Sequence, residues 1–231
     1  MSTEVVTAGL LIGVPLAFNA AFFELGRTFD YPDVLRKKPD EILRRFDAGG
    51  SGLILRWQAL LMSAVAMLPL VALLPIVLEP PAALATGSIV VGAAAGLVQA
   101  LGLARWPFAV PELARRYVAA NGPAAASTRE TVEVAFAVTH RLFDIGIGEH
   151  LGYLLTGLWT LLIAAAVLMG TAVPGWLGLI GMPIGAALLI GCLEFVGAYE
   201  NDGWSLAGAI APIAYDAWSL WLIALGIGIL L

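Results

Sequence analysis

Long runs without a charged side chain are the feature of this sequence that most constrains its fold. Six segments contain no Asp, Glu, Lys or Arg, apart from Asp216 in the last, and they cover residues 5–23, 57–78, 80–104, 151–170, 176–193 and 203–231. A helix needs about 20 apolar residues to cross roughly 30 Å of hydrocarbon, whereas a soluble helix carries charges on its water-facing side. The sequence therefore predicts an all-α integral membrane bundle of about six transmembrane helices.

The overall composition leaves little room for a water-soluble domain. Of the 231 residues, 60% are hydrophobic and only 13% are charged, whereas soluble proteins have about 25% charged residues. We predict a single transmembrane helical domain over residues 1–231. No Lys or Arg precedes the first apolar segment, so we expect a retained anchor and not a cleaved signal peptide.

The basic residues predict the orientation of the bundle. All twelve Lys and Arg lie in two regions, 27–56 and 105–141. Basic residues in short loops stay on the cytoplasmic side, so we expect both regions to face the cytoplasm and both termini to lie outside the inner (plasma) membrane. Residues 40–47, capped by Asp40, and 110–117 are predicted as short helices at the cytoplasmic interface, unless they are ordinary solvated connectors.

The same charges set the expected partners. Besides the lipid bilayer itself, anionic lipid head groups would suit the basic loop over residues 36–45. Nucleic acid is not expected, because the net charge is −5 and the basic residues occupy one side of the bundle. The sequence leaves the oligomeric state open.

Ionisable residues in or beside the apolar segments form the candidate functional site. Each costs several kcal/mol in a membrane unless it is paired or hydrated, so each marks a functional site by default. The candidate binding residues are Arg105, Asp144, Glu149, His150 and Asp216. We expect them to line one cavity in the cytoplasmic half, with Arg105 as the countercharge for Glu149 or Asp144. Gln99 is the expected hydrogen-bond partner of Asp216. The alternative is that these residues only form ion pairs that fix helix register.

No motif of assigned chemistry accompanies this cluster. His-Glu-x-x-His, Cys-x-x-Cys, P-loop and Gly-x-Ser-x-Gly patterns are all absent from the sequence. In an α-helical register His140 and Asp144 share one face while Glu149 projects to the opposite side, so one helix cannot present them all to one site. A metal site using Glu149 and His150 also departs from the Glu-x-x-His spacing of di-iron bundles. We therefore predict no metal and no cofactor, and assign no catalytic residue.

Four short phrases resemble a known family. They are Phe29-Asp-Tyr-Pro-Asp-Val-Leu35, Arg105-Trp-Pro-Phe-Ala-Val-Pro111, Gly148-Glu-His-Leu-Gly-Tyr153 and Tyr215-Asp-Ala-Trp-Ser-Leu-Trp221. With them, nearly the whole chain resembles bacterial membrane proteins of the domain-of-unknown-function 4386 family. The resemblance implies a multi-pass helical bundle and carries no established activity, so no residue role is transferred from it.

Three functions stay open at this point. The first is transport of an ion or small molecule through the polar cluster, and the opposite orientation of the two groups of three spans would suit an inverted repeat, although the halves share no visible similarity. The second is a membrane-embedded enzyme that uses His150 as general base on a lipid or isoprenoid head group. The third is a regulatory or binding protein that acts through its basic cytoplasmic loop. Whether the protein is an enzyme is undecided, and transport is placed slightly ahead.

Overall fold

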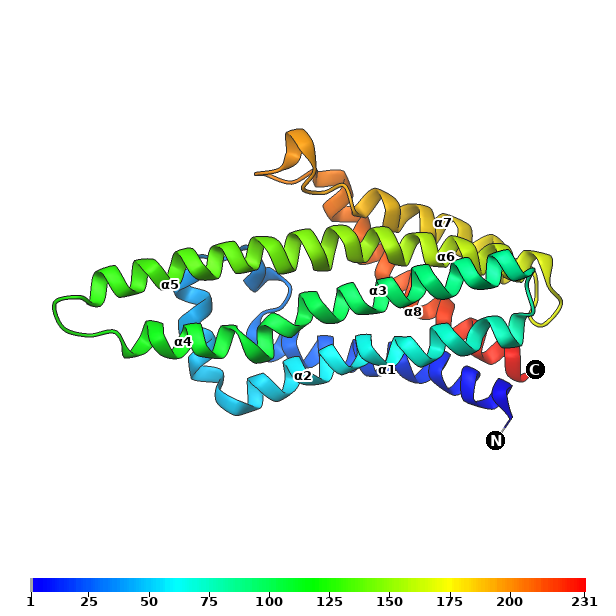
Figure 1. The fold of residues 1–231 in the computed structure, drawn as a ribbon, viewed down its shortest axis with the longest axis horizontal. Helices are drawn as coiled ribbons and strands as arrows, with labels where there is room; N and C mark the ends of the chain where they lie inside the picture. Colours follow the sequence, from blue (N-terminus) through cyan, green and yellow to red (C-terminus); the bar gives the residue numbers. More distant parts are fainter. Residues whose placement is uncertain (1) are drawn as a thin grey trace.

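The computed structural model describes residues 2–231, and over that range the chain is helical without any strand (Figure 1). Its elements are α1 (Thr3–Phe29), η1 (Asp33–Arg36), α2 (Pro39–Leu78), α3 (Ala82–Phe108), α4 (Val110–Ala119), α5 (Ala125–His140), η2 (Arg141–Leu151), α6 (Gly152–Met169), α7 (Trp176–Gly191), η3 (Gly197–Tyr199) and α8 (Ser205–Leu230). Two of these, η1 and η3, are short 3₁₀ helices, and η2 is a π-helix. Five helical stretches are long and apolar enough to cross a membrane, which confirms the predicted all-α membrane bundle.

The fifth expected span is shorter than predicted. The apolar segment continues to residue 193, but α7 ends at Gly191 and contains only 16 residues, which make about 24 Å of helix. Beyond it the chain turns, and the amide of Trp204 donates to the carbonyl of Glu194 at 2.7 Å. The loop before α8 therefore begins a few residues earlier than its hydropathy indicates.

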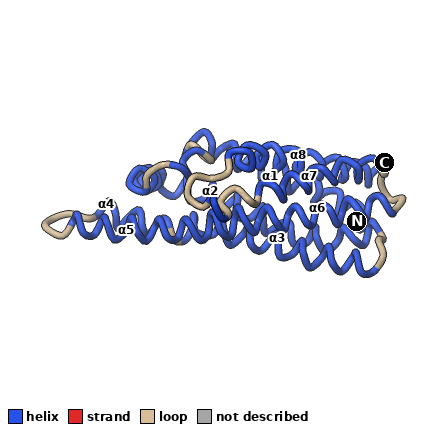
Figure 2. The backbone as a smooth tube through the Cα atoms, turned by 90° about the horizontal axis from the view of Figure 1, so that it is seen from above, coloured by secondary structure: helices blue, strands red, loops and turns tan. Residues whose placement is uncertain are grey.

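Six helices form a closed ring in chain order. Helix α1 packs against α2 and α8, α3 packs against α2 and α6, and α7 packs against α6 and α8. Figure 2 shows these helices running side by side along one axis. Glycine permits the closest approach, because a Cβ on Gly102 of α3 would lie 2.8 Å from the Cα of Gly148 in η2. The ring surrounds an interior to which every one of its helices contributes.

The two ends of the ring carry different parts of the chain. Figure 1 shows both termini at one end, while the α4–α5 hairpin projects from the other. Termini at one end agree with an even number of passes. The basic regions lie toward the hairpin end, and its assignment to the cytoplasm stays a prediction.

Gly50 divides α2 into two helices. Its backbone has φ 55° and ψ −153°, a conformation that glycine adopts without strain. The predicted end of the short helix after residue 47 is thereby confirmed. Asp40 is not the cap, because the helix begins at Pro39 after Lys38. The apolar face of this first part is buried within the protein and not in the headgroup layer; it consists of Ile42, Leu43 and Phe46.

Two apolar cores fill the interior, one toward each end. The core near the termini includes Leu11 of α1. The core near the hairpin is aromatic, with Trp57 and Trp106 stacked at a centroid distance of 4.3 Å, and it includes Leu25 of α1. The stretch of α1 between Leu11 and Leu25 therefore passes the region between the two cores, where the structure contains a cavity.

Candidate functional site

A cavity of about 330 Å³ lies between the two cores. Its wall is made by α1, the loop after α1, α3, η2, α6 and α8, through Phe18, Asn19, Phe22, Tyr31, Pro32, Leu35, Gln99, Gly102, Leu103, Arg105, Asp144, Gly148, Glu149, Tyr153, Pro212, Tyr215 and Asp216. Four of the five candidate residues are in this set, and only His150 is not. The volume falls at the low end of the roughly 300–1,000 Å³ found for small-molecule pockets.

A π-helix places two acids on the cavity wall. The segment η2 is the middle of a continuous helical rod that runs from α5 into α6 (Figure 1). In a π-helix each amide bonds the carbonyl five residues back, which underwinds the helix and brings positions five apart closer to one face than an α-helix does. Asp144 and Glu149 are five apart and both line the cavity. The α-helical register assumed from the sequence would place Asp144 and Glu149 on different faces. That assumption is wrong here because the helix is underwound.

Arg105 is neutralised by Asp144, one of its two expected partners. The Nη2 atom of Arg105 lies 2.5 Å from Oδ1 of Asp144, and Nη1 donates to the carbonyl of Gly102 at 2.6 Å. Nε2 of His140 lies 3.3 Å from the other Asp144 oxygen and 3.2 Å from the carbonyl of Leu35. Because Nε2 carries one hydrogen at most, it cannot donate a full hydrogen bond to both the Asp144 oxygen and the Leu35 carbonyl. Oδ2 of Asp144, buried in the wall, accepts no hydrogen bond within residues 2–231.

Arg36 connects the loop after α1 to two acids at the end of the cavity. Its Nη2 lies 3.3 Å from Oε1 of Glu149 and 3.6 Å from Oε1 of Glu194, and its guanidinium lies 4.9 Å from the ring centre of Phe195. Glu194 belongs to the loop after α7, where burial raises its pKa although Arg36 acts in the opposite direction. The countercharge of Glu149 is therefore Arg36 and not Arg105.

The loop between α1 and α2 closes the hairpin end of the cavity. Asp30, at φ 63°, ends α1 in the left-handed conformation, and the next amide returns to the carbonyl of Leu25. The turn directs the chain into the bundle, where Tyr31, Pro32 and Leu35 line the cavity. A small ligand could leave through this end only if the loop moved.

Three of the five positive charges over residues 36–45 are paired with acids of the chain. Lys37 lies 2.6 Å from Asp30 and 3.2 Å from Glu41, and Arg45 lies near the same two acids. Hydrogen bonds from Lys37 and Arg45 lower the pKa of Asp30. Lys38 is exposed and has no ion pair in the described part of the chain. Arg44 is also exposed and has no ion pair there, although its guanidinium lies 5.1 Å from the ring centre of Tyr117. Lys38 and Arg44 are therefore the two positive charges of this loop that no acid neutralises.

Five aromatic rings line the same cavity, three of them tyrosines. They contact one another, since ring centroids are 5.8 Å apart for Phe18 and Tyr215, 4.8 Å for Phe22 and Tyr31, and 5.6 Å for Tyr153 and Tyr215. The face of an aromatic ring carries partial negative charge. The wall therefore combines apolar surface with a negative electrostatic character.

Asp216 is an unpaired carboxylate at the edge of the cavity. It lies near the middle of α8, is exposed, and receives no ion pair or hydrogen bond from residues 2–231. Its expected partner Gln99 donates instead to Oγ1 of Thr156 at 2.8 Å. The predicted contact between Gln99 and Asp216 is wrong, because the side chain of Gln99 turns toward α6.

His150 is the candidate residue that lies outside the cavity wall. Its Nδ1 is 2.7 Å from the carbonyl oxygen of Cys192. A carbonyl only accepts, so Nδ1 must carry the hydrogen. His150 thus joins η2 to the end of α7, and no acid pairs with it in residues 2–231. Over the same residues, no three His, Cys, Asp or Glu side chains are grouped closely enough to hold a metal ion.

Sequence reasoning missed Arg36 and the aromatic wall. Arg36 stands in a run of basic residues that reads as loop charge, and its partners are more than a hundred positions away along the chain. A signal for the wall was present, since Phe18 and Phe22 lie one helical turn apart and Tyr153 and Tyr215 place hydroxyl groups inside apolar segments.

Comparison with known proteins places the chain in a family. The family model described as Domain of unknown function (DUF4386) matches residues 6–226, so the chain belongs to this family and the resemblance seen in its sequence is confirmed. No curated protein and no solved structure matches the chain. Each of the four phrases that carry the resemblance contributes to the cavity wall, through Tyr31, Pro32 and Leu35, through Arg105, through Gly148, Glu149 and Tyr153, and through Tyr215 and Asp216.

Proposed function

We propose that this member of the DUF4386 family binds an ion or small molecule in the cavity between its two cores and carries it across the plasma membrane. The observation that supports this most is the cavity itself, which brings Arg105, Asp144, Glu149 and Asp216 around about 330 Å³ inside a ring of apolar helices. Ionisable groups at membrane depth are costly and usually mark a ligand or ion pathway.

The loop after α1 would act as the gate at the hairpin end. Arg36 holds it through two partly exposed ion pairs, in which the arginine side chain is 46% exposed and the acid side chains are 16% and 18% exposed. Pairs with one partner in contact with solvent contribute on the order of 1 kcal/mol each. Such contacts are weak enough to break during a transport cycle. The opposite end is closed by the core around Trp159 and Leu222, and a carrier has to open its two ends in turn.

The two other functions have less support from the geometry. An enzyme would need a general base beside its substrate, but the ring of His150 is held by the carbonyl of Cys192 away from the cavity. A regulator that acts through the basic loop would need free positive charge, and only Lys38 and Arg44 supply it, because Lys37 and Arg45 share Asp30 and Glu41. We therefore place transport ahead of both.

Uptake into liposomes tests the proposal. Purified protein would be reconstituted, and uptake of protons or rubidium down an imposed gradient compared with empty liposomes. The test variant combines Glu149→Gln with Asp216→Asn. The matched control, Glu130→Gln with Asp202→Asn, removes the same charge from two exposed residues outside the cavity.

We expect flux above empty liposomes for wild type and for the control, and flux at the empty level for the test variant. Unchanged melting temperatures would show that all three proteins are folded. Absence of proton and rubidium flux in wild type would overturn the carrier proposal for these ions. Equal flux in the test variant would place the pathway elsewhere in the protein.

A further inference from the structure

The charges around the cavity leave negative charge uncompensated. Arg105 is paired with Asp144, and Arg36 is shared between Glu149 and Glu194. Oε2 of Glu149 is buried and has no partner among residues 2–231. Adding Asp216, four carboxylates face two guanidinium groups. A bound cation would neutralise this excess of negative charge.

The lining also favours a cation with apolar substituents. The space is lined by the rings of Phe18, Phe22, Tyr31, Tyr153 and Tyr215, and aromatic faces attract cations, more strongly when water is excluded. A small hydrated ion would keep its water and gain little from these rings. A quaternary or protonated amine with alkyl or aryl groups would contact the rings and the carboxylates together.

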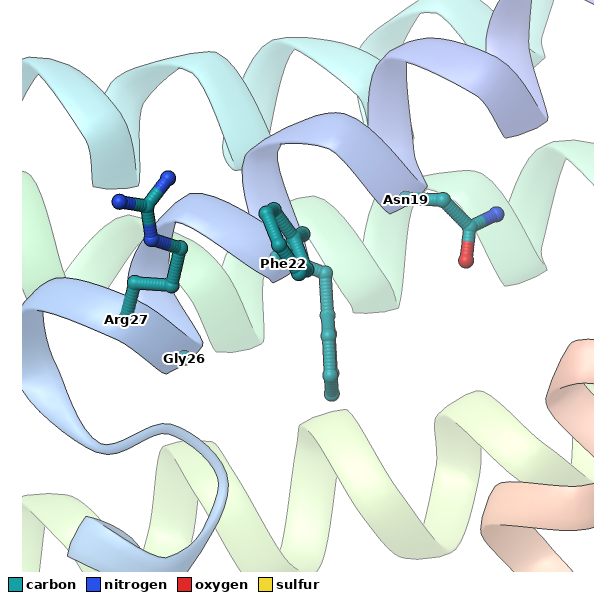
Figure 3. A pocket seen from close by; sticks show the side chains of 5 residues that line it. Asn19, Phe22, Gly26 and Arg27 are labelled. Carbon is teal, nitrogen blue, oxygen red and sulfur yellow. The ribbon is translucent and has the colours of Figure 1, made fainter.

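Residues of α1 belong both to the cavity and to a more open groove on the outer surface of that helix. The loop after α1 covers one end and the core around Trp159 the other. On the side, Pro212 and Asp216 of α8 are exposed. An open groove of about 590 Å³ runs along the outer face of α1, and two of its residues, Asn19 and Phe22, also line the cavity (Figure 3).

The groove is suited to the path of an apolar molecule. Besides Asn19 and Phe22 it is lined by Phe23, Gly26 and Arg27, and the side chain of Phe23 is 63% exposed. Figure 3 shows Asn19, Phe22 and Arg27 in sequence along α1, with Arg27 nearest the turn that follows this helix. Arg27 is paired with Glu24 at 3.6 Å, so its charge is partly neutralised at the groove.

We infer that the ligand is a lipophilic organic cation, a quaternary or protonated amine with apolar substituents, that enters sideways from the bilayer between α1 and α8. Its charged centre lies between Asp216 and Glu149, and its apolar groups lie against the aromatic wall. The inference rests on the proposed function, because it names the class of molecule that the carrier site takes.

Equilibrium binding to protein in lipid nanodiscs tests the ligand class. The probes are radiolabelled tetraphenylphosphonium and tetraphenylborate, which have nearly the same shape and opposite charge, with empty nanodiscs of the same lipid subtracted. We expect saturable binding of the phosphonium alone. Tetramethylammonium, a cation without large apolar groups, should not displace it at equal concentration. Saturable binding of both probes, or of neither, would overturn the inference.

Variants locate the site. Asp216→Asn should weaken phosphonium binding at least about tenfold, because the uncompensated carboxylate is removed, while Asp216→Glu should retain it. Asp202→Asn, which removes one exposed carboxylate outside the cavity, is the matched control for Asp216→Asn. Asn19→Trp, at the junction of groove and cavity, should slow association about tenfold. Binding that is indifferent to the Asp216 variants, or association that is indifferent to Asn19→Trp, would contradict the site or the lateral route respectively.

The two proposals fail in different ways. Phosphonium binding with the expected variant pattern, but without flux of any probe in liposomes, would overturn the carrier and leave the ligand class standing. Proton or rubidium flux that depends on Glu149 and Asp216, without phosphonium binding, would overturn the ligand class and leave the carrier standing.

Discussion

Replacing Arg36 with alanine should release the loop after α1 from the end of the cavity. The change removes the contacts to Glu149 at 3.3 Å and Glu194 at 3.6 Å, together with the stacking on Phe195. The two partly exposed ion pairs contribute about 0.2–1 kcal/mol each, and the cation–π contact about 0.5–1 kcal/mol. The loss of about 1–3 kcal/mol corresponds to a rise of about 5- to 140-fold in the opening equilibrium of the loop.

Amide hydrogen exchange in nanodiscs measures this opening. The amides of Val34, Leu35 and Lys37 donate to carbonyls within the loop, so they exchange when the loop opens. Their exchange should accelerate by about 5- to 140-fold in Arg36→Ala, while Lys38→Ala, which removes a neighbouring unpaired charge, should leave it unchanged. Exchange in Arg36→Ala at the wild-type rate would refute the assignment of Arg36 as the contact that holds the loop.

Three further predictions concern stability and are read from melting temperature or unfolding in detergent. Asp144→Asn leaves Arg105 buried without its countercharge and should lower the free energy of unfolding by about 3–5 kcal/mol. The double change Asp144→Leu with Arg105→Met removes both charges and should recover most of this loss. An Asp144→Asn protein as stable as wild type would contradict the prediction. Gly102→Ala places a Cβ 2.8 Å from the backbone of η2 and should lower the free energy of unfolding by about 1–3 kcal/mol. Gly9→Ala, where no neighbouring atom lies within 4 Å, is the control and should not destabilise the protein. Equal effects of the two changes would refute the close packing at Gly102. The pKa of Asp30 is lowered from 3.8, so its ion pairs stabilise the fold fully above that pH and progressively less as the pH falls below it toward the folded-state pKa. The melting-temperature difference between wild type and Asp30→Asn should be constant above about pH 6 and shrink as the pH is lowered below 3.8. A difference that grows with acidification would contradict the assignment.

The transmembrane fold was predictable because it depends on composition over long stretches. Charge-free runs of sufficient length admit few structures besides membrane helices, and the break at Gly50 follows from a cluster of glycines. The end of α7 was not predictable in this way. The helix ends at Gly191, but the same helix also contains Gly178, Gly181 and Gly185 in its interior, so a glycine does not by itself mark the end. Contacts with the chain before α8, such as the bond from the amide of Trp204 to the carbonyl of Glu194, fix the turn.

The candidate site was predictable in most of its residues, but of its pairings only Arg105 with Asp144 was among those expected. The membrane cost of Arg105, Asp144, Glu149 and Asp216 identifies each from sequence, and the structure brings them to one cavity. Their partners depend on the π-helical register of η2, and no local sequence rule distinguishes that register from an α-helix. The rotation of His150 toward a carbonyl of another helix likewise depends on tertiary packing.

The measurement that tests the central claim most directly is flux through a cavity that has been filled. Leu103 lines the cavity and carries no charge, so Leu103→Trp reduces the cavity volume without adding or removing a formal charge, and Leu103→Ala is the matched control. Uptake of protons, rubidium and tetrapropylammonium would be followed in liposomes containing wild type or either variant. We predict that wild type and Leu103→Ala move at least one of these probes faster than empty liposomes and that Leu103→Trp does not. Movement of none of them by wild type, or equal movement by folded Leu103→Trp, would contradict a transport pathway through this cavity.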